Sequence, residues 1–328
     1  MKRIEWLDFG KGITIFFVML AHVLEGVYKT GNYTQYNELS KVLMGIIFTF
    51  IMPVFFSLSG YLYKIPKTTR EYLQSMKKKA VNLFIPYILF SIVYVAMQHM
   101  GNSVNSLNSW GSLTQIYVKP IGYLWFLYIL FFIFLLVGFL DLLKINKYWQ
   151  LTIYLILFVM SQLIGMPYVL AGTFTWAICF YMGYIIRDLD IVINKKIAIV
   201  LIVILLLGWL YQYNLGGDWY HTNTLGFNNM VTKLVSIPLS VYLFSNIKKN
   251  TFFNYFNKYG RYSLIIYLVH APVTSVIRTI LMHLGVTNYF ILIIGISLIT
   301  WYIALAVCWM SDRFILINRI FYPYKIFK

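Results

Sequence analysis

The sequence is poor in charged residues, and those it has are mostly basic. Only 11% of its 328 residues are charged, against about 25% in a soluble globular domain. The 27 Lys and Arg residues outnumber 10 Asp and Glu residues, which gives a formal net charge of +17. Hydrophobic residues make up 60% of the chain, and the mean hydropathy is +0.73. This composition predicts an integral membrane protein rather than a soluble one.

Cysteine is nearly absent as well. Cys179 and Cys308 both lie inside apolar segments, so they predict neither a disulfide framework nor a zinc site. We interpret both as small buried hydrophobic residues and expect no metal. A cleaved signal peptide is not predicted either, because His22 and Glu25 interrupt the first apolar run and no small-x-small cleavage site follows. We expect a retained first helix.

Apolar runs long enough to span a membrane, roughly 17 to 25 residues, recur along the whole chain. We expect ten spans, at about 11–28, 42–63, 80–98, 121–143, 149–166, 169–187, 197–214, 228–247, 262–282 and 288–311. The predicted fold is therefore an all-α polytopic transmembrane helix bundle. It forms a single membrane domain over 1–328, with no separate soluble domain.

The basic residues are distributed unevenly over the predicted loops. If the N-terminus is cytoplasmic, the cytoplasmic stretches contain 22 of the 27 Lys and Arg residues, whereas the outer loops contain Lys29, Lys41 and Lys119. This bias follows the positive-inside rule and predicts cytoplasmic N- and C-termini. It also accounts for most of the net charge, so we expect no nucleic-acid partner. The predicted spans indicate the cell membrane as the location and the lipid bilayer as a partner.

The stretch "DFGKGITIFFVMLAHVLEG" (8–26) carries ionisable side chains into the first predicted span. Lys11 and His22 are separated by eleven helical steps, which leaves them about 20° apart in azimuth and about 16 Å apart along the axis. That spacing suits a ligand with an anionic end at the rim and a reactive end inside the membrane, such as a coenzyme A thioester. His22 would act as a general base, with Glu25 orienting its ring.

An alternative explains the same residues without chemistry. His22 would be hydrogen-bonded between helices, and Lys11 would extend its side chain to the membrane surface. Spacing alone does not choose between the two interpretations.

Five segments carry a family resemblance. "RIEWLDFGKGITIFFVMLAH" shows a basic residue, ten residues and a histidine, and it is followed in order by "FFSLSGYLY", "KKKAVNLFIPY", "YLWFLYIL" and "YSLIIYLVHAPV". Together they resemble the acyltransferase-3 family of bacterial membrane acyltransferases over nearly the whole chain. One departure is "KKK", where the family often has arginine; lysine serves a phosphate as a point charge but lacks the bidentate fork.

The resemblance implies an O-acyltransferase. It would move an acyl group from cytoplasmic acyl-CoA to a carbohydrate hydroxyl of a cell-surface polysaccharide or its precursor. We expect the acyl group to be acetyl and the donor to be acetyl-CoA. His22 would be the catalytic base, with Glu25 beside it and His270 in a supporting position. Lys11 and the cluster Lys77, Lys78 and Lys79 would bind the CoA phosphates. The cluster could equally be a topological anchor.

Further candidates line the predicted donor and acceptor routes. Ser59 and Trp125 are expected along the CoA arm, although small residues also let helices pack closely and aromatic residues also form interfacial belts. Arg278 and Lys233, toward the outer ends of their spans, could hold an anionic or polyhydroxylated acceptor, or extend toward outer headgroups. Trp219, in the outer loop "NLGGDWYHTNTLGFNN" with Tyr220 and His221, suits a carbohydrate face.

Two expectations concern the wider role of the chain. Because it stops at Lys328, we expect it to act alone or to hand the acyl group to a separate extracytoplasmic transferase. The alternative function is a transporter of a polar solute or polysaccharide intermediate, with Glu25, Lys233 and Arg278 lining the route. Transporters often have broken helices in paired halves, and Pro53 and Pro86 are expected to have no matching pair later, which favours the enzyme.

Overall fold

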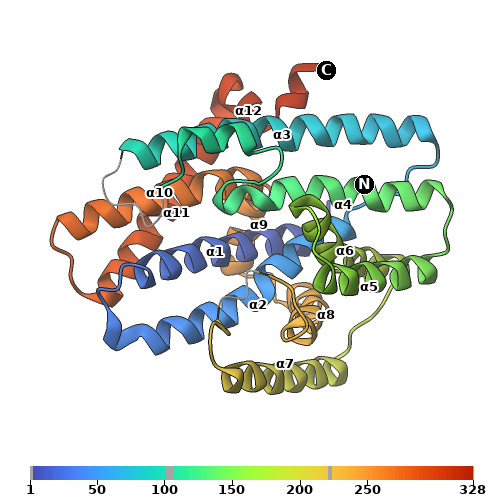
Figure 1. Ribbon diagram of the computed structural model, residues 1–328, viewed down its shortest axis with the longest axis horizontal. Helices are drawn as coiled ribbons and strands as arrows, with labels where there is room; N and C mark the ends of the chain where they lie inside the picture. The colour runs from blue at the N-terminus through green and yellow to red at the C-terminus, as the bar shows by residue number, and fades with distance from the viewer. Residues whose placement is uncertain (1–2, 101–106, 221–223, 328) are drawn as a thin grey trace.

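The computed structural model describes residues 3–100, 107–220 and 224–327, in which every regular element is a helix (Figure 1). The α-helices are α1 (Glu5–Tyr28), α2 (Asn37–Tyr61), α3 (Thr69–Met100), α4 (Trp125–Leu142), α5 (Lys147–Leu163), α6 (Tyr168–Asp188), α7 (Lys195–Leu215), α8 (Met230–Asn246), α9 (Thr251–Gly260), α10 (Ser263–His283), α11 (Tyr289–Arg313) and α12 (Ile315–Phe321). Four short 3₁₀ segments accompany them: η1 (Thr34–Tyr36), η2 (Trp110–Gln115), η3 (Gly122–Leu124) and η4 (Pro323–Phe327). The all-α prediction is confirmed.

Each of the ten predicted apolar windows overlaps one of these helices. Eight helices in the described residues are long and apolar enough to cross a membrane. The other two, α5 and α8, have 17 residues each, which is about 26 Å of helix, slightly less than a hydrocarbon core of about 30 Å. The chain is thus a polytopic membrane protein, and the side on which its termini lie stays a prediction.

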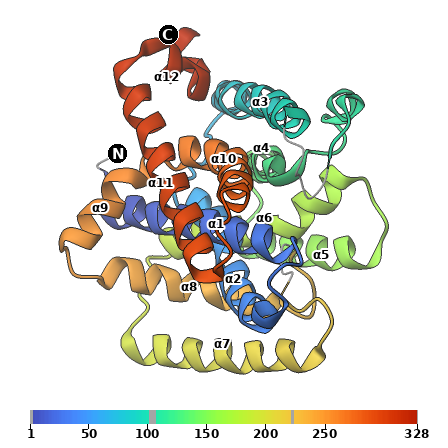
Figure 2. The ribbon, with the colours of Figure 1, turned by 90° about the vertical axis from the view of Figure 1, so that its left-hand side faces the viewer.

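Helix α1 lies in the middle of the bundle, because it packs against α2, α8, α9, α10 and α11. The long helices run roughly side by side across Figure 1. Helix α7 lies at the lower edge of Figures 1 and 2 and packs against α8. The enclosure of α1 explains how its ionisable residues can be held inside the protein rather than in lipid.

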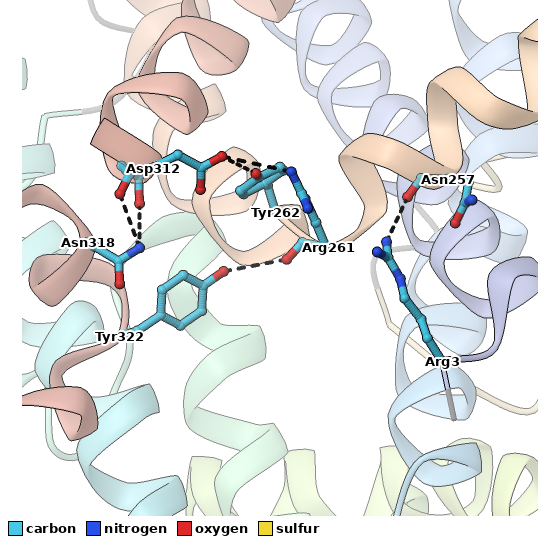
Figure 3. Close-up of polar contacts among 8 residues, drawn as sticks. Arg3, Asn257, Arg261, Tyr262, Asp312, Asn318 and Tyr322 are labelled. Carbon is cyan, nitrogen blue, oxygen red and sulfur yellow. Dashed lines mark hydrogen bonds and ion pairs between the residues drawn. The ribbon is translucent and has the colours of Figure 1, made fainter. Parts of the chain in front are cut away.

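The region 248–261, expected to be a cytoplasmic loop, contains the helix α9. Asn250 caps it, its side chain accepting a hydrogen bond from the Phe253 backbone N–H at 2.9 Å. Helix α9 lies directly on the start of α1: a Cβ at Gly260 would come within 1.6 Å of the Asp8 carbonyl oxygen. Arg3 also donates to the Asn257 carbonyl at 3.4 Å (Figure 3). These contacts hold the end of α1 that carries Lys11.

The C-terminal region is attached to the same end of the bundle. Arg261 and Asp312 form an ion pair at 3.8 Å, and the Tyr262 hydroxyl donates to the same carboxylate (Figure 3). Asn318 in α12 donates to the Ser311 carbonyl at 3.2 Å. The start of α10 and the end of α11 are therefore joined by polar contacts.

Prolines also occur later in the chain than expected. Pro53 and Pro86 lie inside α2 and α3, but Pro238 and Pro272 lie inside α8 and α10. The expectation that the first pair would have no later counterpart is wrong, so proline distribution does not argue against a transporter.

Candidate functional site

Three cavities are arranged along α1. The Lys11 cavity, of about 210 Å³, is lined by Lys11, Ser59 and Ser263 among apolar residues. The central cavity, of about 740 Å³, contains His22 and Glu25 in its wall. The Arg278 pocket, of about 130 Å³, shares both of these residues and adds Arg278. His22 therefore lines both the largest of these three cavities and the Arg278 pocket.

His22 belongs to a row of ionisable side chains on one face of α1. Its Nδ1 lies 3.4 Å from Oε2 of Glu25, and Oε1 of Glu25 accepts a hydrogen bond from Nζ of Lys29 at 2.7 Å. The spacings i+3 and i+4 are those at which helical side chains meet. The His22 side chain is 28% exposed and that of Glu25 is 13% exposed, so the ring reaches the cavity while the carboxylate is largely shielded.

The Nδ1 contact has a chemical consequence for the other ring nitrogen. A carboxylate only accepts hydrogen bonds, so it favours the His22 tautomer with hydrogen on Nδ1. Nε2 then keeps its lone pair, as a general base requires. Sequence reasoning identified His22 and Glu25 but placed Lys29 in an outer loop. Its position four residues after Glu25 was the signal that would have found it.

His270 comes from α10 and packs against His22. The two ring centroids are 5.2 Å apart with planes at 37°. His270 is fully buried, and its Nδ1 lies 3.2 Å from the Ile266 carbonyl oxygen. Since a carbonyl only accepts, this nitrogen carries the hydrogen. Its Nε2 has no hydrogen-bond partner within the described part of the chain. His270 thus packs against the His22 ring and is not among the residues that line the central cavity or the Arg278 pocket.

The Lys11 cavity and the central cavity share a wall at Tyr267. The Tyr267 hydroxyl donates to the Tyr123 carbonyl, and the Tyr123 hydroxyl donates to the Leu268 carbonyl at 2.6 Å. These reciprocal bonds hold α10 against η3. Both tyrosine rings also lie beside His270, with centroids 5.8 Å and 5.3 Å away. Lys11 and His22, which the helical repeat places on one face of α1, thus line two adjoining cavities.

Two of the residues predicted for the donor lie in different compartments. Ser59 lines the Lys11 cavity, and its hydroxyl donates to the Phe55 carbonyl at 3.0 Å. Trp125 lines the central cavity instead, where its ring centroid is 5.6 Å from that of Trp176. Trp125 therefore lines the same cavity as His22.

The lysine cluster lies at the Lys11 end of the bundle, outside the cavity wall. Lys77 and Lys78 are exposed, and Lys78 lies over the Tyr324 ring at 5.7 Å. Lys79 is half-buried, with Nζ 3.1 Å from the Ser75 hydroxyl. The α3 residue in the cavity wall is Leu83, one turn further along. A role of the cluster in phosphate binding stays a prediction.

One of the three predicted acceptor residues lines a cavity, and the other two are not among the residues that line the three cavities described above. Arg278 lines the Arg278 pocket and donates to the Gly26 carbonyl at 2.9 Å. Lys233 is fully buried, donates to the Phe48 carbonyl at 2.9 Å and lies 5.7 Å from the Trp176 ring centroid. The position of Lys233 suits joining α8 to α2 better than touching a substrate.

Trp219 likewise packs against protein. A Cβ at Gly45 would lie 2.4 Å from the Trp219 ring, and the ring meets Tyr213 edge-on at 5.4 Å. Trp219 therefore closes the loop onto α2. The neighbouring Tyr220 is buried and its hydroxyl lies 3.0 Å from that of Tyr28, whereas His221 lies outside the described residues.

Sequence reasoning missed the far wall of the central cavity. Trp176 faces Trp125, and Gln162, Tyr168 and Thr175 add polar groups. The Thr175 hydroxyl lies 2.9 Å from that of Ser161, to which Gln162 donates at 3.0 Å. Aromatic faces with nearby amide and hydroxyl groups are suited to a polar ring-shaped ligand. Nothing in the local sequence of α5 and α6 distinguished these residues from ordinary core positions.

Comparison with known proteins gives one family and one relative. The model of a family described as an acyltransferase domain matches residues 4–309. The Nodulation protein NolL of Mesorhizobium japonicum is 25% identical over 143 residues, which are 43% of this chain and 37% of that protein. The chain therefore matches little more than a third of that relative's length. No solved structure matches significantly.

Proposed function

The chain belongs to this acyltransferase family, and we propose that it transfers an acyl group, acetyl in the first instance, from cytoplasmic acetyl-CoA to a carbohydrate hydroxyl. The acceptor would be a cell-surface polysaccharide or its precursor. The observation that carries the proposal is the position of His22, on the face of α1 that also carries Lys11 and in the wall of the central cavity.

The donor would enter from the Lys11 end. Lys11, with the cluster Lys77–Lys79 outside it, supplies positive charge for the phosphates of CoA. The mostly apolar Lys11 cavity suits the uncharged arm, and Ser59 lies in its wall. The shared wall at Tyr267 is where the thioester would pass toward His22. This direction of entry agrees with the cytoplasmic N-terminus predicted from the loop charges.

The acceptor would occupy the central cavity. Trp125 and Trp176 offer aromatic faces for a sugar ring, and Gln162 and Thr175 offer hydrogen bonds for its hydroxyl groups. Transfer then needs a single base. Nε2 of His22 takes the proton from the acceptor hydroxyl as its oxygen attacks the thioester carbonyl carbon. The carbon–sulfur bond breaks, and the departing thiolate takes that proton from the imidazolium.

Glu25 and His270 act on His22 in different ways. Glu25 holds the Nδ1 hydrogen and stabilises the imidazolium formed during transfer. Lys29 keeps the carboxylate in place through its 2.7 Å contact. His270 fills the space behind the ring, and its position fixes the ring orientation. These are positioning roles, because the proton transfer is made by His22.

The proposal is tested by thiol release from acetyl-CoA by the purified protein in detergent. We expect release, increased by added polysaccharide or oligosaccharide from the source cells, with the acetyl group recovered on the carbohydrate. If the protein neither binds nor cleaves acetyl-CoA, the acetyl-CoA proposal fails and transport of a polar solute becomes the leading account.

Replacing Lys11 by alanine should raise the KM for acetyl-CoA by about 10-fold, the loss expected for one charge-assisted contact. The value of kcat should change much less, because Lys11 is remote from the acyl group. Steady-state kinetics of thiol release measure both constants. Lys64→Ala is the matched control, since Lys64 is an exposed lysine after α2 and outside the wall of the Lys11 cavity. An unchanged KM in Lys11→Ala would remove Lys11 from the donor site.

Replacing Glu25 by glutamine should lower kcat by about 10- to 100-fold, because the amide can orient the ring but does not stabilise its positive charge. Lys29→Met should have a smaller effect in the same direction, since it leaves the carboxylate present. The KM for acetyl-CoA should stay within about twofold of wild type in both. Equal kcat in wild type and Glu25→Gln would show that the carboxylate does not assist His22.

A further inference from the structure

Arg278 is a buried cation in the second half of α10. The residue is only 6% exposed, and its Nη1 donates a hydrogen bond to the Gly26 carbonyl oxygen at 2.9 Å. Within the described residues, no carboxylate oxygen lies within 4.0 Å of it. Glu25 lines the same pocket, but its two oxygens face Lys29 and His22. A buried charge without an ionic partner is destabilising, so such residues mark functional sites.

A second polar group faces the same pocket. Thr274 lies one turn before Arg278 on α10 and is 4% exposed. Its hydroxyl has no hydrogen-bond partner within the described residues. A guanidinium has five N–H donors in a planar fork, and a hydroxyl supplies one more. Together they match an anionic group with several oxygen atoms.

The size of the pocket limits what it can hold. Its volume is about 130 Å³, and a water molecule occupies about 30 Å³ of liquid. One carboxylate or phosphate group fits, whereas a complete sugar ring requires the central cavity. Since His22, Glu25 and Lys29 line both spaces, a group in the Arg278 pocket lies beside a sugar at His22.

We propose that the Arg278 pocket binds an anionic oxygen group of the acceptor, through Arg278 and Thr274, next to the hydroxyl that receives the acyl group. This inference rests on the proposed function and narrows its substrate class to acidic acceptors. The anion has two sources with the same chemistry: the carboxylate of a sugar acid, or the phosphate of a phosphorylated precursor. Pairing the guanidinium with substrate also explains why none of the described carboxylates forms an ion pair with it.

The test is ligand binding to the full-length protein in neutral detergent, measured by isothermal titration calorimetry without acetyl-CoA. The probes are methyl glucuronide, glucose 6-phosphate and the neutral methyl glucoside, at constant ionic strength. We expect at least one anionic probe to bind about 10-fold more tightly than the glucoside. Tighter binding of the glucuronide identifies a sugar acid, and tighter binding of the phosphate identifies a phosphorylated precursor.

Variants test whether the preference for an anionic probe over the glucoside depends on the Arg278 pocket. Arg278→Gln should remove this preference, and Arg278→Lys should retain part of it. Thr274→Val, which keeps the side-chain shape and breaks no hydrogen bond described above, should reduce it several-fold. Thr300→Val is the matched control, because Thr300 in α11 also has a buried hydroxyl without a partner in the described residues, away from this pocket. Size-exclusion profiles identify any variant that fails to fold.

Two results overturn the inference. Either no anionic probe binds wild type more tightly than the glucoside, or the preference persists in both Arg278→Gln and Thr274→Val. The experiment is independent of the proposed function, because it needs no acyl donor. If anionic probes bind more tightly but no thiol is released, acetyl transfer is disproved and the anion site is retained. If thiol is released but anionic probes bind no more tightly, the anion site is disproved and acetyl transfer is retained.

Discussion

Replacing His22 by alanine should lower acetyl-CoA-dependent transfer by about 1,000-fold, within the range of 10²–10⁴ that a positioned general base contributes. The reason is that Nε2 of His22 is the proposed base beside the central cavity, and Glu25 and His270, which contact the ring, would not replace it. The measurement is thiol release and acetyl transfer by the purified protein. Acetyl-CoA binding should persist, because the Lys11 cavity is left intact.

The control for this variant is His283→Ala. His283 lies at the exposed end of α10, where its Nδ1 lies 2.8 Å from the Thr279 carbonyl, so its loss should leave turnover unchanged. A folded His22→Ala protein that transfers acetyl groups at the wild-type rate would show that His22 is structural. The interpretation as a histidine packed between helices would then hold.

Replacing Gly183 by alanine should destabilise the protein by about 3 kcal/mol or more, at the upper end of the range for overpacking. A Cβ there would lie 1.8 Å from the Ser57 carbonyl oxygen, and a Cβ at Gly60 would lie 1.8 Å from the Phe180 carbonyl oxygen. Helices α2 and α6 therefore touch backbone to backbone, and neither carbonyl can move without disturbing its helix. We expect loss of folded protein, measured as thermal unfolding and monodisperse yield in detergent.

Gly165→Ala is the matched control, because no atom lies within 4 Å of a Cβ built at Gly165, which is exposed between α5 and α6. The Gly183→Ala substitution should also lower activity, because α2 carries Ser59 and α6 carries Trp176. A Gly183→Ala protein with wild-type stability would mean that α2 and α6 can separate at little cost. The small residues of "FFSLSGYLY" would then not be there for close packing.

The helical architecture could be predicted because it depends on local properties. An apolar run of about 20 residues must satisfy its backbone hydrogen bonds internally when it lies in lipid, so it forms a helix. Each of the ten predicted runs overlaps one. Helix α9 was missed because it is short, with only 10 residues. Its Phe253 and Phe256 pack against Phe9 of α1.

The relation between His22 and Glu25 was also predictable, since neighbours on one helix face are determined by the helical repeat. The contact between His22 and His270 was not, because it joins residues 248 positions apart in different helices. The same applies to the burial of Arg278 with no carboxylate within 4.0 Å among the described residues, and to the wall at Tyr267 that the two cavities share. Lys233 could be recognised as an intramembrane cation, but only its surroundings place it behind Trp176.

By itself the sequence determined the class of protein, the positions of the ten longest α-helices in the described residues, which leave out α9 and α12, and the row of ionisable residues on α1. These follow from hydrophobicity and helical periodicity, which act over a few turns of chain. Only the tertiary structure decided which helices enclose His22, which cations line a cavity and where the cavities join. Those features depend on how ridges, small residues and backbone contacts from distant segments fit together, and no local pattern encodes that packing.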